Sequence, residues 1–293
     1  MQLSGLLTNH VRAFCLVAVI SFSSGVVVQR AQLPSFLLRL FRASPASAVK
    51  VNPPAWSDPF VLVVAGQSNA ANHGRPRGRA GAGSYAVSAA GVFRLEDPLP
   101  GSSGLGGSPW PHWAALQRQA RPVSHVVVAS VAQGSSAVAD WIPGGVHAPR
   151  LPEVLKALRS QQLAVDAVVW HQGETEAWIG SDTSAYAANL RRWIASVRAL
   201  GIDAPIYVCL TSRDGQGVIN PGIRQAQASV WNSQERVFAG PDTDSLGDSL
   251  RSDGVHFNAR GLEAFAVLLQ RAMDQPSSQR AIRLDDLPLS SRP

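Results

Sequence analysis

A serine that directly follows an apolar run is the first residue able to do chemistry. Residues 60–65 are continuously apolar, and Ser68 follows within the segment GQSN at 66–69. A serine hydroxyl at the end of a buried strand can act as a nucleophile once a base takes its proton. The alternative is a serine that caps a helix, which is common at strand-to-helix junctions. This segment alone leaves both interpretations open.

An aspartate and a histidine far along the chain can supply the base. Asp253 and His256 lie three residues apart, just before a helical pattern for which Asn258 is the expected N-cap. On one loop, the carboxylate can accept from one imidazole nitrogen and leave the other free to face Ser68. The non-catalytic alternative is a solvated aspartate and a histidine that caps a helix. Ser68, Asp253 and His256 are therefore a candidate Ser-His-Asp triad.

Two further loops carry groups that can stabilise a negatively charged oxygen. Gly134 follows the apolar run 124–132, and its backbone N–H can face a neighbouring loop without a side chain in the way. Gln172 follows the run 167–170 and offers a side-chain amide. A lone glycine after a strand more often only completes a turn. His171 lies inside the strand end, and we expect it to be structural.

The hydrophobic pattern predicts the scaffold that must bring these loops together. Several apolar runs are too continuous for a one-faced strand and are typical of parallel strands buried on both faces. Helical spacings lie between them, so we expect a three-layer α/β/α sandwich with a central parallel sheet. Reactive groups gather at the carboxyl ends of such strands. The runs are 60–65, 124–132, 167–170 and 206–210, and the helical patterns are 151–158, 186–197 and 262–273.

In combination, the motifs of this chain resemble those of the SGNH/GDSL hydrolases. The branch they resemble contains sialate O-acetylesterases and the acetyl xylan esterases of carbohydrate esterase family six. The resemblance implies the flavodoxin-like SGNH hydrolase fold and an esterase that removes O-acetyl groups from a carbohydrate. It covers about residues 60–273 and rests on GQSN at 66–69, Gly134 followed by Trp141, WHQGE at 170–174, IRQAQ at 223–227 and SDGVHF at 252–257.

The same resemblance implies a role for each site residue. Ser68 is the nucleophile, His256 the general base and Asp253 its orienting acid, in a two-step acyl transfer that needs no cofactor. The oxyanion hole comprises the N–H groups of Ser68 and Gly134 and the side chain of Gln172, where the wider superfamily has asparagine. The branch often has Gly-Gly-Thr in its second loop, whereas this chain has Gln-Gly-Ser at 133–135. The residues expected to support the site or contact substrate are Gln67, Asn69 and Glu174.

Two other functions fit parts of the sequence. A lipase or thioesterase of the same superfamily would act on a non-sugar ester, but the small and polar residues at 101–108 do not favour an apolar acyl groove. A catalytically idle carbohydrate-binding domain on the cell surface is the alternative from another class. The intact Ser68, Asp253 and His256 argue against it.

Composition and spacing exclude several other classes of function. The net charge of +6 is not concentrated in one block, so nucleic acid is not an expected partner. The histidines form neither an HxxxH pair nor a cluster with cysteine, so we predict no metal. A basic loop at 75–79 could attract an acidic polysaccharide, but a solvated loop with no partner is the favoured interpretation. Aromatic rings that could stack on sugars are Trp110, Trp113, Trp141 and Trp178.

The N-terminal part of the chain bears on compartment. Residues 13–28 are apolar or small without interruption, which is typical of a signal peptide or a membrane anchor. The basic residues that follow this run would favour a cytoplasmic location of that flank, which conflicts with secretion. We expect an extracytoplasmic protein, with membrane attachment through 13–28 as one possibility. The expected order is a signal peptide or anchor at 1–48, a linker at 49–59, the esterase domain at 60–273 and a disordered tail at 274–293.

Overall fold

The computed structural model describes residues 48–121 and 123–288. The segment expected to be a signal peptide or anchor, 1–48, lies outside the described residues except for its last residue. Within the described ranges, no helix has both the length and the apolar character needed to cross a membrane.

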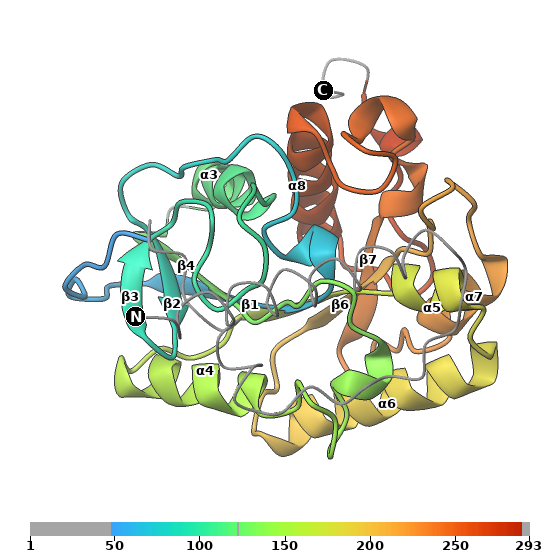
Figure 1. The fold of residues 1–293 in the computed structure, drawn as a ribbon. Helices are drawn as coiled ribbons and strands as arrows, with labels where there is room; N and C mark the ends of the chain where they lie inside the picture. The colour runs from blue at the N-terminus through green and yellow to red at the C-terminus, as the bar shows by residue number, and fades with distance from the viewer. Residues whose placement is uncertain (1–47, 122, 289–293) are drawn as a thin grey trace, which may run out of the picture. The chain divides into compact units, whose positions relative to one another are not determined.

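The domain is built on a seven-stranded sheet with the order β3-β2-β4-β1-β5-β6-β7 (Figure 1). All neighbouring strands run parallel except the edge strand β3, which is antiparallel to β2. Strand β1 lies between β4 and β5. On one side β5, β6 and β7 follow outward in chain order, whereas on the other side β4 lies between β1 and the earlier strand β2. The strands are β1 (Pro59–Gly66), β2 (Ser84–Ser88), β3 (Gly91–Arg94), β4 (His125–Ser130), β5 (Ala167–His171), β6 (Ile206–Leu210) and β7 (Val237–Asp242).

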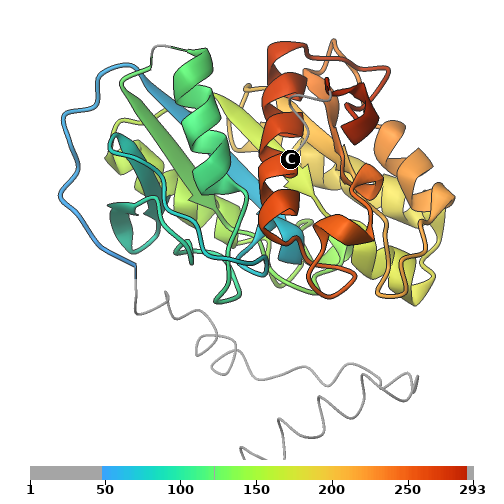
Figure 2. The ribbon, with the colours of Figure 1, turned by 90° about the horizontal axis from the view of Figure 1, so that it is seen from above.

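Helices cover both faces of this sheet, with α4 and α6 on one face and α3 and α8 on the other (Figures 1 and 2). The expectation of a three-layer α/β/α sandwich is confirmed. The helices are α3 (Trp110–Ala120), α4 (Arg150–Ser160), α5 (Glu174–Ile179), α6 (Thr183–Ala199), α7 (Pro221–Ala228) and α8 (Ala259–Asp274). Short 3-10 turns are η1 (Ser68–Ala70), η2 (Val138–Asp140), η3 (Thr243–Ser245), η4 (Asp248–Leu250) and η5 (Leu284–Asp286).

Strand β1 shows why its sequence is apolar at every position. Val61 and Val63 pack into the core beneath α4 and α6, whereas Leu62 and Val64 pack into the core beneath α3 and α8. All four side chains are fully buried. A strand in the middle of a parallel sheet has no solvent face, so alternation is lost.

The segment expected to be a linker, 49–59, instead packs on the domain. Val49 O accepts from Arg94 N at 3.0 Å, and Val51 N donates to Val92 O at 3.0 Å, which continues the sheet beyond β3. The ring of Trp56 packs edge-on against Tyr85, with ring centroids 5.2 Å apart. The Pro-rich composition of this segment is typical of a linker. The pairing with β3 uses only a few backbone groups, which leave no signal in the side-chain sequence.

The expected disordered tail is also corrected for residues 275–288. Ala239 N donates to Ser277 O at 2.7 Å, and Asp242 N donates to Ile282 O at 2.8 Å. These bonds run along the outer edge of β7, and Leu287 is buried against the α8 side. An otherwise unpaired sheet edge thus orders a polar segment that has little hydrophobic signal of its own.

Candidate active site

The site lies where three neighbouring strands end. Ser68, Gly134 and Gln172 follow the carboxyl ends of β1, β4 and β5, which are adjacent in the sheet. Ligands bind at such ends, at the point where the strand order reverses. Gly66 makes this junction possible, since its φ is +140° and a Cβ there would lie 2.1 Å from the carbonyl oxygen of His171. Only glycine allows β1 and β5 to approach this closely.

Ser68 opens the 3-10 turn η1 and is only 6% exposed. Within the described residues, neither its hydroxyl nor its backbone N–H has a hydrogen-bond partner in the protein. Gln67 does not cap the turn with its side chain. The hydroxyl and the adjacent N–H are therefore both available to a ligand, which a helix-capping serine would not be.

Asp253 and His256 form a hydrogen-bonded pair in the loop before α8. Asp253 Oδ2 lies 2.7 Å from His256 Nδ1, and Oδ1 accepts from the backbone N–H of Val255 at 3.0 Å and of His256 at 2.7 Å. Partial burial raises the pKa of Asp253, but the hydrogen bonds from His256 and Val255 outweigh it, so this pKa lies below its ordinary value. Asp253 thus stays ionised, and the imidazole keeps Nε2 available. Asn258 caps α8 as expected, accepting from Gly261 N at 3.1 Å.

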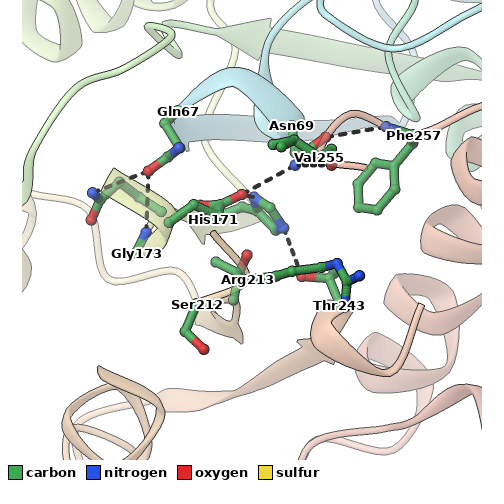
Figure 3. Close-up of polar contacts among 12 residues, drawn as sticks. Gln67, Asn69, His171, Gly173, Ser212, Arg213, Thr243, Val255 and Phe257 are labelled. Carbon is green, nitrogen blue, oxygen red and sulfur yellow. Dashed lines mark hydrogen bonds and ion pairs between the residues drawn. The ribbon is translucent and has the colours of Figure 1, made fainter. Parts of the chain in front are cut away.

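Asn69 holds the serine loop against the histidine loop (Figure 3). Its Nδ2 donates to Val255 O at 3.2 Å, and its Oδ1 accepts from Phe257 N at 3.4 Å. One side chain next to Ser68 therefore binds the backbone on both sides of His256. Among the described residues, no hydrogen bond joins the Ser68 hydroxyl to His256. Catalytic bonds are often long in free enzymes and tighten when substrate binds.

Glu174, at the start of α5, holds the side chain of Asn69 in place. Its Oε1 accepts from Asn69 Nδ2 at 3.1 Å, and the side chain is buried at the start of α5. Burial raises the pKa of Glu174, opposed by hydrogen bonds that include the one from Asn69. The carboxyl group therefore supports the loop that carries the nucleophile.

The side chain of Gln67 extends to the start of α5 (Figure 3). Its Oε1 accepts from Thr175 N at 3.2 Å and from Gly173 N at 3.4 Å. The backbone N–H of Gln67 donates to His171 O at 3.0 Å. Gln67 therefore ties the ends of β1 and β5 together and does not face a ligand.

The two other expected oxyanion donors have partners within the protein. Gly134 N donates to Ser103 Oγ at 2.7 Å. Gln172 is fully buried, and its Nε2 lies within hydrogen-bond distance of Ser136 O at 3.0 Å, Gln67 Oε1 at 3.3 Å and the carboxylate of Glu176. For Gln172 to donate to an oxyanion, one of these acceptors must be released.

His171 is fully buried, and its Nε2 is paired with Thr243 Oγ1 at 2.9 Å (Figure 3). Burial lowers the pKa of His171 to about 3, so the ring is neutral. It cannot reach solvent or substrate without rearrangement of the core.

Four residues of the site were not identified from the sequence. Arg251 donates to Val255 O, Thr243 O and Leu246 O and lies over the Phe257 ring, which fixes the histidine loop from the interior. Burial lowers the pKa of Arg251 to about 10. No motif or spacing in the sequence distinguishes these residues from ordinary loop residues. The other three are His73, Ser103 and Glu176.

The tryptophans separate into core and surface. Trp178, at the end of α5, is 50% exposed and lies against Gly215, so it is the one of the four named rings open to a sugar. The basic loop is solvent-facing at Arg75 and Arg77. Within the described ranges, no three metal-ligating side chains are grouped to hold a metal ion. The buried rings are Trp110, Trp113 and Trp141.

Comparison with known proteins places this chain in a family. Residues 105–275, more than half of the chain, match the family described as carbohydrate esterase, sialic acid-specific acetylesterase. A protein from Arabidopsis thaliana superposes with a TM-score of 0.63 at 20% identity, over 74% of this chain and 98% of the other. NanS superposes with a TM-score of 0.58 at 15% identity, over 77% and 98%.

At these identities the structures demonstrate the shared fold only. No curated protein sequence matches the chain. The family match is a match of this amino-acid sequence to the family. It covers the Gly134, WHQGE and SDGVHF segments but not the segment of Ser68. The chain belongs to the family described as carbohydrate esterase, sialic acid-specific acetylesterase.

Proposed function

We propose that this protein is a serine esterase that removes O-acetyl groups from a carbohydrate, with Ser68, His256 and Asp253 as its triad. The observation that carries the proposal is the Asp253–His256 hydrogen bond of 2.7 Å. Asn69, the residue after Ser68, holds the loop that carries this pair beside the serine through hydrogen bonds to Val255 and Phe257. A hydrogen-bonded Asp-His pair adjacent to a serine with a free hydroxyl is the arrangement that acyl transfer requires.

The first half of the reaction acylates the serine. His256 Nε2 takes the proton from Ser68 as its oxygen bonds to the acetyl carbonyl carbon. The tetrahedral intermediate then collapses, the bond to the sugar oxygen breaks, and His256 returns its proton to that oxygen. Asp253 stabilises the imidazolium that exists between these two events. In the second half, water activated by His256 attacks the acetyl-enzyme, and acetate leaves.

The oxyanion of each tetrahedral intermediate needs preorganised donors. The free N–H of Ser68 supports its assignment as one of them. The N–H of Gly134, at the end of the neighbouring strand, is a second candidate donor, provided that it is released from Ser103 Oγ. Gln172 is a third candidate donor, provided that it releases an internal acceptor.

Sugar as the acyl carrier is supported by the family description and by the exposed ring of Trp178. An aromatic face at a site can stack on a pyranose ring. We also propose that the protein meets this substrate outside the cytoplasm, because 13–28 has the composition of a signal peptide or anchor. N-terminal sequencing and fractionation of the mature protein test the location.

The function is tested by turnover of esters with the full chain and its Ser68→Ala variant. We expect hydrolysis of 4-nitrophenyl acetate to exceed that of the octanoate, and acetate release from at least one O-acetylated glycan in a panel. Ser68→Ala should lower kcat by about 10⁴ or more without loss of fold, as for other triad removals. Equal turnover by the variant would refute the triad. Preference for octanoate would favour a lipase or thioesterase, and no turnover of any ester would favour an idle binding domain.

A further inference from the structure

The loop around Ser103 lies between the loop after β1, which carries Ser68, and the loop after β4, which carries Gly134. Ser103 N donates to Ala132 O at 3.1 Å, and Ser103 O accepts from Asn72 N at 2.9 Å. Its backbone is therefore fixed to the loop after β4 on one side and to the loop after β1 on the other. A residue held between these two loops is positioned to contact a group bound at Ser68.

The side chain of Ser103 lies at a chemically informative point. Its Oγ is 2.7 Å from Gly134 N, which is within the 2.7–3.1 Å expected between an oxyanion and its donor. The same oxygen is 3.1 Å from His73 Nε2. A Cβ added to Gly134 would lie 2.9 Å from His73 Nε2, so these three groups are in close mutual contact.

His73 connects this serine to the general base. Its ring stacks on the ring of His256, with centroids 5.4 Å apart and planes inclined by 23°. Burial and, to a smaller extent, the neighbouring His256 lower the pKa of His73 to about 4, against an opposing effect of Asp253. His73 therefore stays neutral at neutral pH and does not compete with His256 for the proton of Ser68.

A serine hydroxyl has one proton to donate and two lone pairs to accept with. Gly134 N–H occupies one lone pair of Ser103. If His73 donates its Nε2–H to the other, both lone pairs are used, and the only remaining capacity of the hydroxyl is to donate its proton. Gly134 N–H, meanwhile, is already engaged, and the amide of Gln172 has three internal acceptors.

We propose that the Ser103 hydroxyl is a direct oxyanion donor, oriented by His73 and by the Gly134 N–H, which acts through Ser103. This inference rests on the proposed esterase function and identifies an additional catalytic residue within it. His73 is a positioning residue. The oxyanion then receives hydrogen bonds from the Ser68 N–H and the Ser103 O–H, and two hydrogen bonds into Ser103 polarise its O–H bond.

The test compares Ser103→Ala with Ser103→Thr in the full chain, using 4-nitrophenyl acetate. The adjacent Ser102 is the matched control, because its hydroxyl is paired with Ser130 Oγ. Ser103→Ala should lower kcat by about 10²-fold, as for other lost oxyanion donors, with KM changed by less than about threefold. Ser103→Thr keeps the hydroxyl and should retain most of kcat, and Ser102→Ala should behave like the wild type.

The opposite result has a distinct meaning. If Ser103 only blocks the Gly134 N–H in the free enzyme, its removal exposes that donor, and Ser103→Ala then equals or exceeds the wild type in kcat. That outcome would overturn the proposal. Ser68→Ala measured in parallel separates the two claims: loss of turnover there with no loss in Ser103→Ala refutes Ser103 alone, whereas retained turnover in Ser68→Ala refutes the esterase triad.

Two variants of His73 test the positioning role independently of Ser103 substitution. His73→Phe keeps a flat ring against His256 but cannot donate to Ser103, whereas His73→Gln lacks the ring but can donate through its amide. We expect His73→Phe to lower kcat by about tenfold or more, whereas His73→Gln should keep most of the wild-type kcat. The reverse order would mean that ring stacking, not the hydrogen bond to Ser103, is what the site needs.

Discussion

The two walls of the site are built in different ways. The inner wall consists of buried motif residues that bond to one another and to backbone, and they are Gln67, His171, Gln172 and Glu174. The outer wall consists of partly exposed residues on three separate loops, and they are His73, Ser103, Asp253 and His256. On the outer wall, the imidazole of His256 keeps Nε2 available, and the hydroxyl of Ser103 keeps its proton available to donate. The buried residues of GQSN and WHQGE other than Ser68 thus fix the geometry, whereas Ser68 and the partly exposed loops carry the proposed chemistry.

The two motif histidines, His171 and His256, should differ most in the effect of their removal. His256→Ala removes the general base and should lower kcat by about 10⁴. His171→Ala removes an imidazole from the core and should lower the free energy of unfolding by about 2–5 kcal/mol with a much smaller loss of kcat in the folded fraction. Kinetics and urea unfolding of both variants provide the comparison. A larger kcat loss in His171→Ala would exchange their roles.

Asn69 lies where the two walls meet, so its loss should affect both. Asn69→Ala removes the bridge to Val255 and Phe257 and leaves the buried Glu174 without this donor. We expect kcat to fall by about 10- to 10²-fold and the free energy of unfolding to fall by about 1–3 kcal/mol. Unchanged kcat in a destabilised variant would show that the two loops meet without Asn69.

Gln172 tests the inner wall directly. Its three internal acceptors predict that Gln172→Ala mainly costs stability, about 1–3 kcal/mol, because the buried Glu176 Oε2 loses its donor. We expect kcat to fall by less than about tenfold. Thermal unfolding and kcat on 4-nitrophenyl acetate measure the two effects. A loss of 10²–10³ in kcat with a native melting temperature would instead place Gln172 in the oxyanion hole.

The smallest expected effect concerns acid stability of the outer wall. Burial lowers the pKa of His73 to about 4 in the folded protein, below its ordinary value of 6.5. The unfolded chain therefore binds a proton between these pH values that the folded chain does not, so this residue reduces stability as pH falls from 6.5 to 4. His73→Gln lacks this effect, and its unfolding free energy should decline less than that of the wild type between pH 7 and pH 5. Parallel declines would contradict the lowered pKa.

The sequence predicted the parts of this molecule that depend on local pattern. The central strands and the helices α4, α6 and α8 have continuous or helical hydrophobic spacing, and the structure contains them. The strands β2 (SYAVS) and β3 (GVFR) contain serine, glycine or arginine in place of a continuous apolar run, and β7 ends in Gly-Pro-Asp, so their patterns are too weak to stand out. The ordered segments 49–56 and 275–288 depend on sheet edges that no local pattern reveals.

The same distinction applies to the site. Asp253 and His256 are three residues apart, so their hydrogen bond follows from local spacing. Ser103 and His73 are 30 residues apart, and their contact arises only because two irregular loops cross. Arg251 likewise acts through backbone carbonyls, which carry no sequence signal. Long-range contacts between loops therefore remain hidden until the fold is known.

The central claim is that Ser68 is a nucleophile activated by His256, and covalent labelling tests it most directly. The full chain is treated with an alkyl fluorophosphonate, which phosphonylates activated serines, and the modified peptide is identified by mass spectrometry. We predict one adduct, on Ser68, formed far more slowly in His256→Ala. An adduct on Ser103 or another serine, or equal labelling of Ser68 in His256→Ala, would contradict the account.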